Sequence, residues 1–344
     1  MKELWKHLKD SKKPIVLYGM GNGADKIIKV LEAYGIKYSG VFASDGFVRD
    51  KIFHGFKISS YSYLKGQLGE MIVLLCFGSN RAEVIDNILK ISSENEFYAP
   101  DVPVIGGELF TEEYAREHSK ELEWVYGLLA DDLSRRTFEN TIKYKLSGKI
   151  DYLMDCETDP EEPYDSFLKL SDNESFLDLG AYNGDTVTDF VNRTNGYRKI
   201  TAVEPDFKTF KKLVRSTENF SNTECINAGI SSFCGEGAFS MKHGRNSSAL
   251  GGNTSVHFTT VDALVKNGDV TYIKMDIEGE ELNAIAGAAD TIRRLSPKML
   301  ISCYHRTEDI ITIPKAVNNI KKDYRLYMRH FHSLPAWDTN YYFI

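Results

Sequence analysis

The stretch 176–187 has the residue types and spacing of a site for a small cofactor. Asp178, Gly180 and Gly184 form an acid-x-Gly-x-x-x-Gly pattern, with strand-like apolar residues before it and helical apolar spacing after it. Glycines let a ligand approach the backbone closely, and an acid at a strand end can hold a cationic or hydroxylated group. The stretch therefore predicts a strand, a turn and a helix that cradle a nucleotide-like cofactor.

A second glycine turn lies near the start of the chain. Gly19, Gly21 and Ala24 fit the Gly-x-Gly-x-x-Gly/Ala pattern of dinucleotide sites, and Asp45 ends the next expected strand, near where an acid would reach a ribose. The pattern leaves two interpretations open: an NAD-type or sugar-nucleotide site, and a tight turn whose glycines serve packing alone. We favour the second, because a lone pattern of this kind is a weak signal.

Strands and helices alternate through both halves of the chain, as doubly wound sheets require. Residues 1–107 are expected to form a small Rossmann-like α/β domain, with strands at 15–18, 38–45, 71–77 and 102–105. In the second half, 166–344, strands are expected at 176–179, 199–204, 223–227, 270–276 and 298–304. Residues 324–332 and 340–344 are expected to close this sheet as an antiparallel pair, and residues 229–258 to form hairpins and a loop around 247–252.

The region 108–165 is expected to connect the two domains. Its first part, to residue 150, is rich in helix formers with a recurring apolar stripe, which favours helices in an interdomain or dimer contact. The segment 155–165 is acidic and broken by prolines, so it is expected to be an exposed linker or lid.

Two helices of the second half are predicted in more detail. Helical spacing after residue 206 places Phe207, Phe210, Leu213 and Val214 on the inward face. A later helix is expected to begin near residue 312, which would put Pro314 in its first turn, where a missing N–H costs little.

The composition indicates which binding partners and which cellular location to expect. The formal charge of −7 argues against nucleic acid or an anionic membrane as the main partner. The longest apolar run, 71–77, is too short to span a bilayer. The five cysteines include no Cys-x-x-Cys pair and no zinc spacing, which favours a reducing, cytoplasmic location.

Several motifs of the second half resemble those of the FkbM family of S-adenosylmethionine-dependent methyltransferases. The pattern at 178–184 is similar to the first motif of class I methyltransferases, and Lys-x-Asp-x-Glu-Gly-x-Glu at 274–281 is similar to the FkbM signature. Ala-Val-Glu-Pro-Asp at 202–206 and Val-Asp-Ala-Leu at 261–264 also match. The resemblance covers about 167–344, implies a class I methyltransferase sheet there, and does not reach the first domain.

The resemblance implies S-adenosylmethionine as the cofactor and suggests its contacts position by position. Glu204 would accept hydrogen bonds from the ribose hydroxyls. The helix start at Asp185 and Thr186 would face the cofactor's carboxylate, and Asn227 would lie near the adenine. The other residues expected to line the cofactor are Asp178, Gly180, Ala181, Tyr182, Gly184 and Pro205.

An activated methyl donor leaves the protein mainly to position the acceptor and to remove its proton. Asp276 and Glu278, at the end of the fourth strand, could do either, and we favour Asp276. His305 is another candidate base, where FkbM relatives often carry an acid instead. His305 with Glu308 or Asp309 could bind a metal, but no tight ligand spacing supports this, and we expect no metal ion.

These observations predict a two-domain α/β enzyme that methylates a hydroxyl of a sugar, glycan precursor or natural product. Its partner would be a small-molecule or glycan acceptor, with no nucleic acid and no membrane, and a homodimer through the N-terminal or connecting region is left open. Two other classes also stay open. One is an NAD-linked or sugar-nucleotide enzyme centred on the turn at Gly19, and the other is a non-catalytic binding module that keeps the methyltransferase fold.

Overall fold

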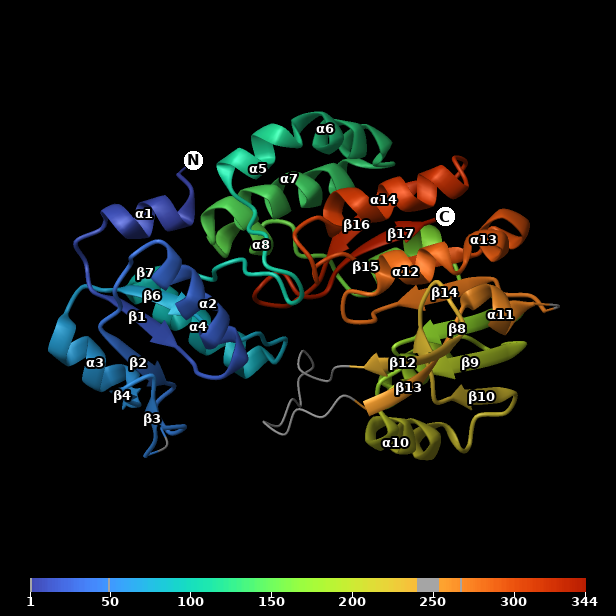
Figure 1. Cartoon of the computed structure of the whole chain (residues 1–344), viewed down its shortest axis with the longest axis horizontal. Helices are drawn as coiled ribbons and strands as arrows, with labels where there is room; N and C mark the ends of the chain where they lie inside the picture. Colours follow the sequence, from blue (N-terminus) through green and yellow to red (C-terminus); the bar gives the residue numbers. More distant parts are fainter. Residues whose placement is uncertain (1, 49, 240–253, 267) are drawn as a thin grey trace.

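Two α/β domains are bridged by helices in the computed structural model, which describes residues 2–48, 50–239, 254–266 and 268–344. Figure 1 shows the N-terminal domain on the left, the C-terminal domain on the right and the connecting helices along the top. The loop expected at 247–252 lies outside the described residues. None of the described helices combines the length and the apolar character needed to cross a bilayer.

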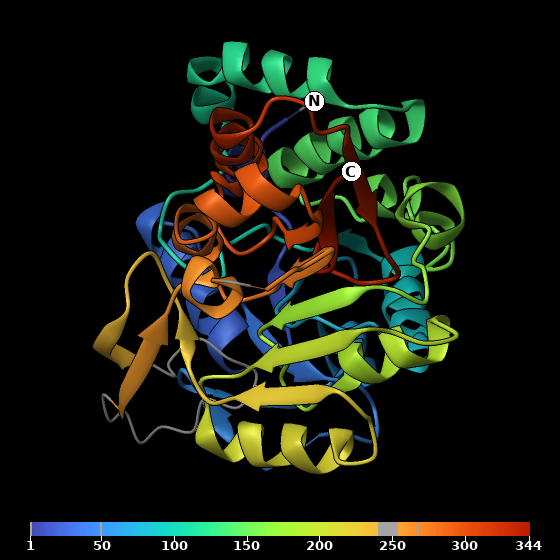
Figure 2. The ribbon, with the colours of Figure 1, turned by 90° about the vertical axis from the view of Figure 1, so that its right-hand side faces the viewer.

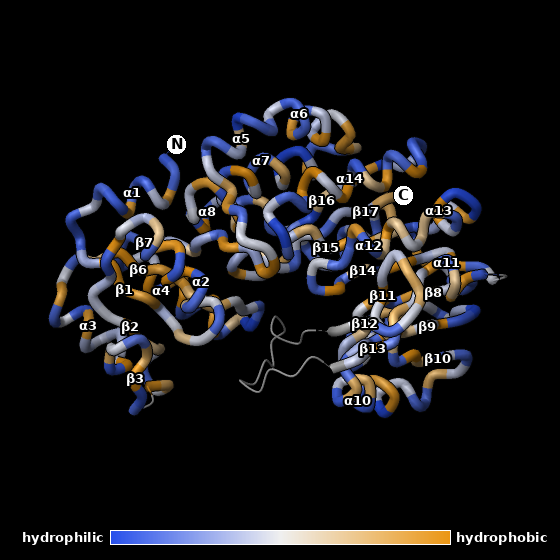
Figure 3. Tube along the Cα trace, viewed as in Figure 1, coloured by the Kyte–Doolittle hydropathy of each residue, from blue (hydrophilic) through white to orange (hydrophobic). Residues whose placement is uncertain are grey.

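The N-terminal domain is built on a parallel sheet of five strands in the order β5-β2-β1-β6-β7. Every residue of β1, β2 and β6 is buried, which is typical of a sheet covered on both faces, and Figure 3 shows this interior mostly in orange. The strands are β1 (Ile15–Tyr18), β2 (Gly40–Ala43), β5 (Ser59–Ser60), β6 (Ile72–Leu75) and β7 (Glu96–Tyr98), and β3 (Ile52–Phe53) and β4 (Phe56–Lys57) form a separate hairpin. The helices are α1 (Leu4–Asp10), α2 (Asn22–Ala33), α3 (Tyr61–Leu68) and α4 (Ala82–Glu94).

The prediction of a strand at residues 102–105 was wrong. The edge strand is β7, at Glu96–Tyr98, and residues 102–105 are irregular. Pro103 has no N–H to donate to a sheet, and the segment instead crosses to the other domain, where the N–H of Ile105 donates to the carbonyl oxygen of His305 at 2.9 Å.

The C-terminal domain has a sheet of seven strands in the order β10-β9-β8-β14-β15-β17-β16. Its first five strands are parallel, and β16 and β17 form the predicted antiparallel pair at the edge. The strands are β8 (Ser175–Leu179), β9 (Lys199–Val203), β10 (Thr223–Ile226), β14 (Tyr272–Met275), β15 (Lys298–Ser302), β16 (Leu326–His330) and β17 (Thr339–Phe343). The helices are α9 (Asp185–Arg193), α10 (Phe207–Thr217), α11 (Val261–Val265), α12 (Glu281–Ala286), α13 (Ala289–Leu295) and α14 (Asp309–Ile320). A small sheet is formed by β11 (Gly229–Ile230), β13 (Thr254–Thr259) and β12 (Gly235–Phe239).

The connecting helices complete the core of the C-terminal domain. They are α5 (Glu112–Glu117), α6 (Ser119–Leu128), α7 (Asp132–Ser147) and α8 (Asp151–Met154), followed by a π-helical turn, η1 (Tyr164–Leu168). Val125 and Phe138 belong to the same buried cluster as Met328 and Tyr341 of the sheet. Figure 2 shows the green connecting helices above the red strands of the chain's end.

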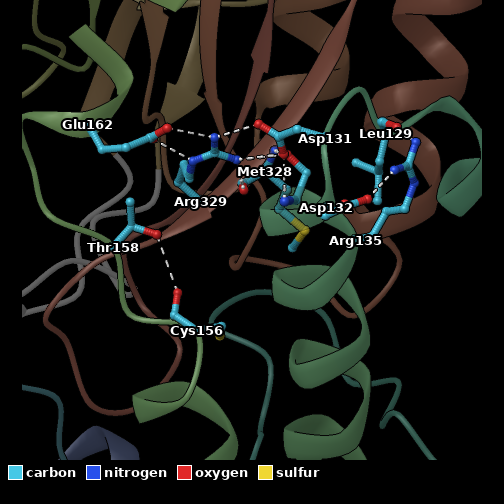
Figure 4. A network of polar contacts seen from close by, with 10 residues as sticks. Leu129, Asp131, Asp132, Arg135, Cys156, Thr158, Glu162, Met328 and Arg329 are labelled. Carbon is cyan, nitrogen blue, oxygen red and sulfur yellow. Dashed lines mark hydrogen bonds and ion pairs between the residues drawn. The ribbon is translucent and has the colours of Figure 1, made fainter. Parts of the chain in front are cut away.

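The segment 155–165 exposes most of its acidic residues, as predicted, but it is fixed to the sheet and is not a free linker or lid. Cys156 and Thr158 are buried, and the N–H of Thr158 donates to the carbonyl oxygen of His330 at 2.8 Å. Glu162 accepts two hydrogen bonds from Arg329, at 2.6 and 2.9 Å, and this contact fixes the segment to β16 (Figure 4). The segment is acidic because Glu162 pairs with the buried Arg329 and because its other acidic side chains face the solvent.

Two helix predictions also differ from the structure. Leu213 of α10 is buried as expected, but Phe207 and Val214 are exposed, and the Phe207 ring lies 4.4 Å from Lys211 Nζ. Helix α14 begins at Asp309, so Pro314 lies one turn further in than predicted.

Candidate active site

The turn between β8 and α9 forms the predicted cradle. Gly180 (φ +81°) and Gly184 (φ +87°) adopt left-handed conformations, which glycine reaches without strain. A Cβ atom at Gly180 would lie 2.0 Å from the carbonyl oxygen of Asp276, so the turn lies directly against the end of β14. Ala181 is fully buried beneath the turn, and Tyr182, at φ +45°, is exposed at its surface.

Glu204 follows β9 and is held by the neighbouring backbone. Its Oε2 accepts from the N–H of Tyr182 at 3.1 Å, and its Oε1 accepts from the N–H of Asp206 at 2.8 Å. Burial raises the pKa of Glu204 to about 7, although both N–H groups favour the ionised form. The amide of Asn227 donates to the carbonyl oxygens of Glu204 and Pro205, at 2.8 and 3.1 Å, and so braces this turn.

Asp178 lies fully buried at the end of β8. It faces Lys274 across the β8–β14 register, and its Oδ1 accepts from Lys274 Nζ at 3.5 Å. Burial raises the pKa of Asp178, and Lys274 opposes the rise. Its Oδ2 has no hydrogen-bond partner among the described residues, so one buried acceptor next to the cradle remains available.

Helix α9 begins directly at the cradle. Gly184 is its N-cap residue and supplies no side-chain cap, while Asp185 Oδ1 accepts from the N–H of Thr186 at 2.8 Å. The N-terminus of a helix carries a partial positive charge, which favours an anionic group nearby.

Side chains from the ends of β14 and β15 gather next to the cradle. The Tyr304 hydroxyl donates to Asp276 Oδ1 at 3.1 Å. Nε2 of His305 lies 3.4 Å from Asp276 Oδ1 and 3.9 Å from Glu278 Oε2, and Nδ1 of the same ring lies 3.0 Å from Glu281 Oε1. The structure therefore brings the three predicted catalytic residues together and adds Tyr304 and Glu281 to them.

This cluster has a buried side and an open side. The His305 and Glu281 side chains are 1% exposed, whereas those of Asp276 and Glu278 are 34% and 48% exposed. Burial alone would lower the pKa of His305, but the carboxylates of Glu281, Asp276 and Glu278 raise it to about 9. Burial would raise the pKa of Asp276, but Lys274 and His305 hold it below its usual value. The exposed side of the cluster therefore carries the ionised carboxylate of Asp276.

The N-terminal glycine turn serves close packing at two of its three glycines, since a Cβ atom at Gly23 would lie 2.2 Å from the carbonyl oxygen of Cys76. A Cβ atom at Gly19 would lie 2.5 Å from the Phe77 ring, whereas no heavy atom lies within 4 Å of one placed at Gly21. The carboxylate of Asp45 accepts hydrogen bonds from the backbone N–H and the hydroxyl of Ser62. Asp45 is therefore engaged within its own domain.

Segment 103–107 of the N-terminal domain nevertheless contacts the group formed by Asp276, Glu278, Glu281, Tyr304 and His305, which we call the acid cluster. The N–H of Ile105 donates to the carbonyl oxygen of His305 at 2.9 Å. The Ile105 side chain and Arg306 both lie against Gly279, whose carbonyl oxygen accepts from Arg306 Nε at 2.9 Å. The loop that carries Glu278 is thus held from both domains.

Sequence reasoning missed Lys274, Tyr304 and Glu281 as site residues. Lys274 and Glu281 both stand in the signature at 274–281, which was their available signal. Tyr304 directly precedes His305, and only the pairing of β14 with β15 brings it to Asp276.

A known protein family matches most of the C-terminal half of the chain. The family described as "Methyltransferase FkbM domain" matches residues 178–331. No curated protein sequence matches the chain.

One solved structure is similar over nearly the whole chain and shows its fold, and two others match about half of the chain. The methyltransferase FkbM from Methylobacillus flagellatus KT is 20% identical, with a TM-score of 0.71 over 96% of this chain and 90% of that one. The fibrillarin of Aeropyrum pernix with bound S-adenosyl-L-methionine is 14% identical, with a TM-score of 0.34 over 51% of this chain and 67% of that one. The putative methyltransferase SMU.1697c of Streptococcus mutans, in complex with SAH, is 14% identical, with a TM-score of 0.33 over 54% of this chain and 99% of that one. The C-terminal domain therefore matches the FkbM methyltransferase domain over residues 178–331, and the fold of the chain is that of a methyltransferase.

Proposed function

We propose that this protein transfers a methyl group from S-adenosylmethionine to a hydroxyl of a sugar, glycan precursor or natural product. The observation that carries the proposal is Glu204 beside the Gly180–Gly184 turn, within an FkbM methyltransferase domain. Ligands of open α/β sheets bind beyond the carboxyl ends of the strands, where the strand order reverses. Here that point lies between β8 and β14, next to the cradle.

The residues around the turn fit the parts of this cofactor. Glu204, held by two backbone N–H groups, would accept hydrogen bonds from the ribose hydroxyls. The start of α9 at Asp185 would face the carboxylate of the methionine part, and the unpaired Asp178 Oδ2 could accept a hydrogen bond from the cofactor's ammonium or from a water bound to it. In this arrangement Asn227 would lie near the adenine while bracing the Glu204 turn.

Methyl transfer to a hydroxyl requires that the acceptor be positioned against the methyl group and that its proton be removed. The bound cofactor supplies a methyl group on a positively charged sulfur. Asp276 would accept the proton of the acceptor hydroxyl as the sulfur–methyl bond breaks and the oxygen–methyl bond forms, which leaves S-adenosylhomocysteine. Tyr304 and His305 hold Asp276 from two sides, and Glu278 stands at the open side, where it could orient the acceptor. Positioning alone can contribute about 7 kcal/mol or more to lowering the barrier.

Transfer of a labelled methyl group from S-adenosylmethionine to sugars and fractionated cell extract tests the proposal. The Asp276→Asn variant should transfer at least about a hundredfold more slowly than wild type while binding S-adenosylhomocysteine equally well, because only the proton acceptor is lost. The exposed Glu218→Gln variant is the matched control and should transfer at the wild-type rate. Unchanged transfer by Asp276→Asn would remove Asp276 from the mechanism, and a wild-type protein that labels no acceptor and binds no S-adenosylhomocysteine would contradict the function.

A further inference from the structure

We propose that Asp276, Glu281 and His305 bind one divalent transition-metal cation at the carboxyl ends of β14 and β15. One donor atom from each side chain can be chosen so that all three lie within 4.8 Å of one another. Ligands on opposite sides of a cation, each about 2.1 to 2.4 Å from it, are separated by about 4.2 to 4.8 Å. The three side chains could therefore share an ion with small movements.

Two buried atoms of this cluster have no hydrogen-bond partner among the described residues. They are Oε2 of Glu281 and Nδ1 of His305, both on side chains that are 1% exposed. His305 Nδ1 lies 3.0 Å from Glu281 Oε1, which is an ion-pair distance when the imidazole is protonated, whereas Glu281 Oε2 has no hydrogen-bond partner among the described residues. Native proteins rarely leave such atoms unpaired, because an unsatisfied buried polar group costs about 1 to 3 kcal/mol. Both atoms are potential metal ligands.

The cluster also carries more negative than positive charge. In the part of the chain that the structure describes, no lysine or arginine forms an ion pair with Asp276, Glu281 or the adjacent buried Asp309. Lys274 pairs with Asp178, and Arg306 Nε donates to the carbonyl oxygen of Gly279, so His305 is the cationic group that faces these carboxylates among the described residues. One imidazolium cannot balance three carboxylates, and a divalent cation bound in place of its proton would supply more positive charge.

The donor set indicates which cations fit. Two carboxylates and one imidazole suit Mn²⁺, Fe²⁺ or Zn²⁺ better than Ca²⁺, which takes more oxygen ligands. Three protein ligands leave coordination positions open, and the exposed side of Asp276 is the side from which a further ligand could enter. A bound cation could take the acceptor hydroxyl as a ligand and promote loss of its proton. This last role rests on the proposed function, whereas cation binding does not.

Titration of the chelator-treated full chain with Mn²⁺, followed by electron paramagnetic resonance, tests the site. We expect one site per chain, displaced by Zn²⁺, and an affinity at least tenfold weaker in Glu281→Gln and in His305→Gln. The Glu280→Gln variant is the matched control, because its carboxylate is the neighbour in sequence but accepts a hydrogen bond from Asn283. It should bind Mn²⁺ as wild type does.

The wild-type protein provides a second readout that does not depend on the variants folding. Spin-echo spectra of the bound Mn²⁺ should show coupling to the nitrogen of one imidazole. Absence of Mn²⁺ binding, absence of this nitrogen signal, or equal affinity in the two variants would overturn the site. Binding of S-adenosylhomocysteine, measured on the same sample, separates the two proposals: Mn²⁺ without cofactor binding contradicts the function alone, and cofactor without Mn²⁺ binding contradicts the cation site alone.

Discussion

Glu204 is a buried carboxylate that, among the described residues, accepts hydrogen bonds from two backbone N–H groups alone. Burial raises its pKa from 4.5 to about 7, so without a ligand the folded chain holds this proton to higher pH than the unfolded chain does. The stability contributed by this proton is present below about pH 4.5 and is lost as the pH rises through about 7. Ribose hydroxyls donate to a carboxylate, so the cofactor should bind the ionised form.

Affinity for S-adenosylhomocysteine should therefore rise with pH. Between pH 6 and pH 8 the ionised fraction of a group with a pKa of about 7 rises about tenfold, and calorimetry should show a rise in affinity of that order. Glu204→Gln should bind more weakly and with little pH dependence. An equally steep pH dependence in that variant would assign the titration to another group.

Local patterns in the sequence were enough to select Asp178, Gly180 and Glu204, because each stands at the end of a strand that alternation predicts. Lys274 stands in the 274–281 signature, but its contact with Asp178, like that of Tyr304 with Asp276, could not be predicted in that way. Their contacts depend on which strands are neighbours, and β14 joins the sheet between β8 and β15 although about 90 residues separate it from β8. Strand order is a property of the whole sheet that single-strand patterns do not contain.

Arg329 of β16 ties three elements together. Its guanidinium donates to Asp131, at the start of α7, and to Glu162 (Figure 4). It also lies over the Phe167 ring. The Arg329 side chain is 1% exposed, whereas the two acids are partly exposed. Removing the arginine would leave both carboxylates without their counter-charge.

Arg329→Met should lower the free energy of unfolding by about 3 kcal/mol, measured by urea denaturation. Methionine retains the apolar contact with Phe167 but pairs with neither acid. Arg325→Met, at an exposed arginine next to the same strand, should change stability by less than about 0.5 kcal/mol. Similar losses in both variants would show that the ion pairs add little.

Helix boundaries and faces were predicted less well than strands. Apolar spacing alone placed Phe207 and Val214 inward, but only part of the apolar stripe of α10 contacts the sheet. Pro314 is tolerated inside α14 because the carbonyl oxygen of Ile310, which loses its helical donor there, accepts from the Tyr341 hydroxyl at 2.8 Å. That partner comes from β17, so no local signal could have predicted it.

The N-terminal domain, the connecting helices and the C-terminal domain make more contacts with one another than the two-domain pattern of the sequence indicates. Connecting helices α6 and α7 supply Val125 and Phe138 to the core of the C-terminal domain. From the N-terminal domain, Ile105 contacts the loop of the acid cluster. The domain boundaries 1–107, 108–165 and 166–344 therefore remain a prediction from the sequence. Because the connecting helices belong to the C-terminal core, we expect residues 108–344, and not 166–344, to be the shortest C-terminal fragment that folds.

Truncation tests this directly. A fragment of residues 108–344 should unfold cooperatively, whereas a fragment of residues 166–344 exposes the apolar surface that α6 and α7 cover and should aggregate or melt at a much lower temperature. Thermal unfolding by circular dichroism gives the comparison. Equal stability of the two fragments would mean that the connecting helices are not part of the core.

The most direct test of the proposed function is calorimetric titration with S-adenosylhomocysteine at pH 8. Wild type should bind one equivalent, and Glu204→Ala should bind at least about tenfold more weakly, because the ribose hydroxyls lose a charged acceptor. Glu224→Ala, at an exposed glutamate of the adjacent strand β10, should bind like wild type. No heat from wild type, or equal affinities for wild type and Glu204→Ala, would contradict the cofactor site and with it the methyl transfer.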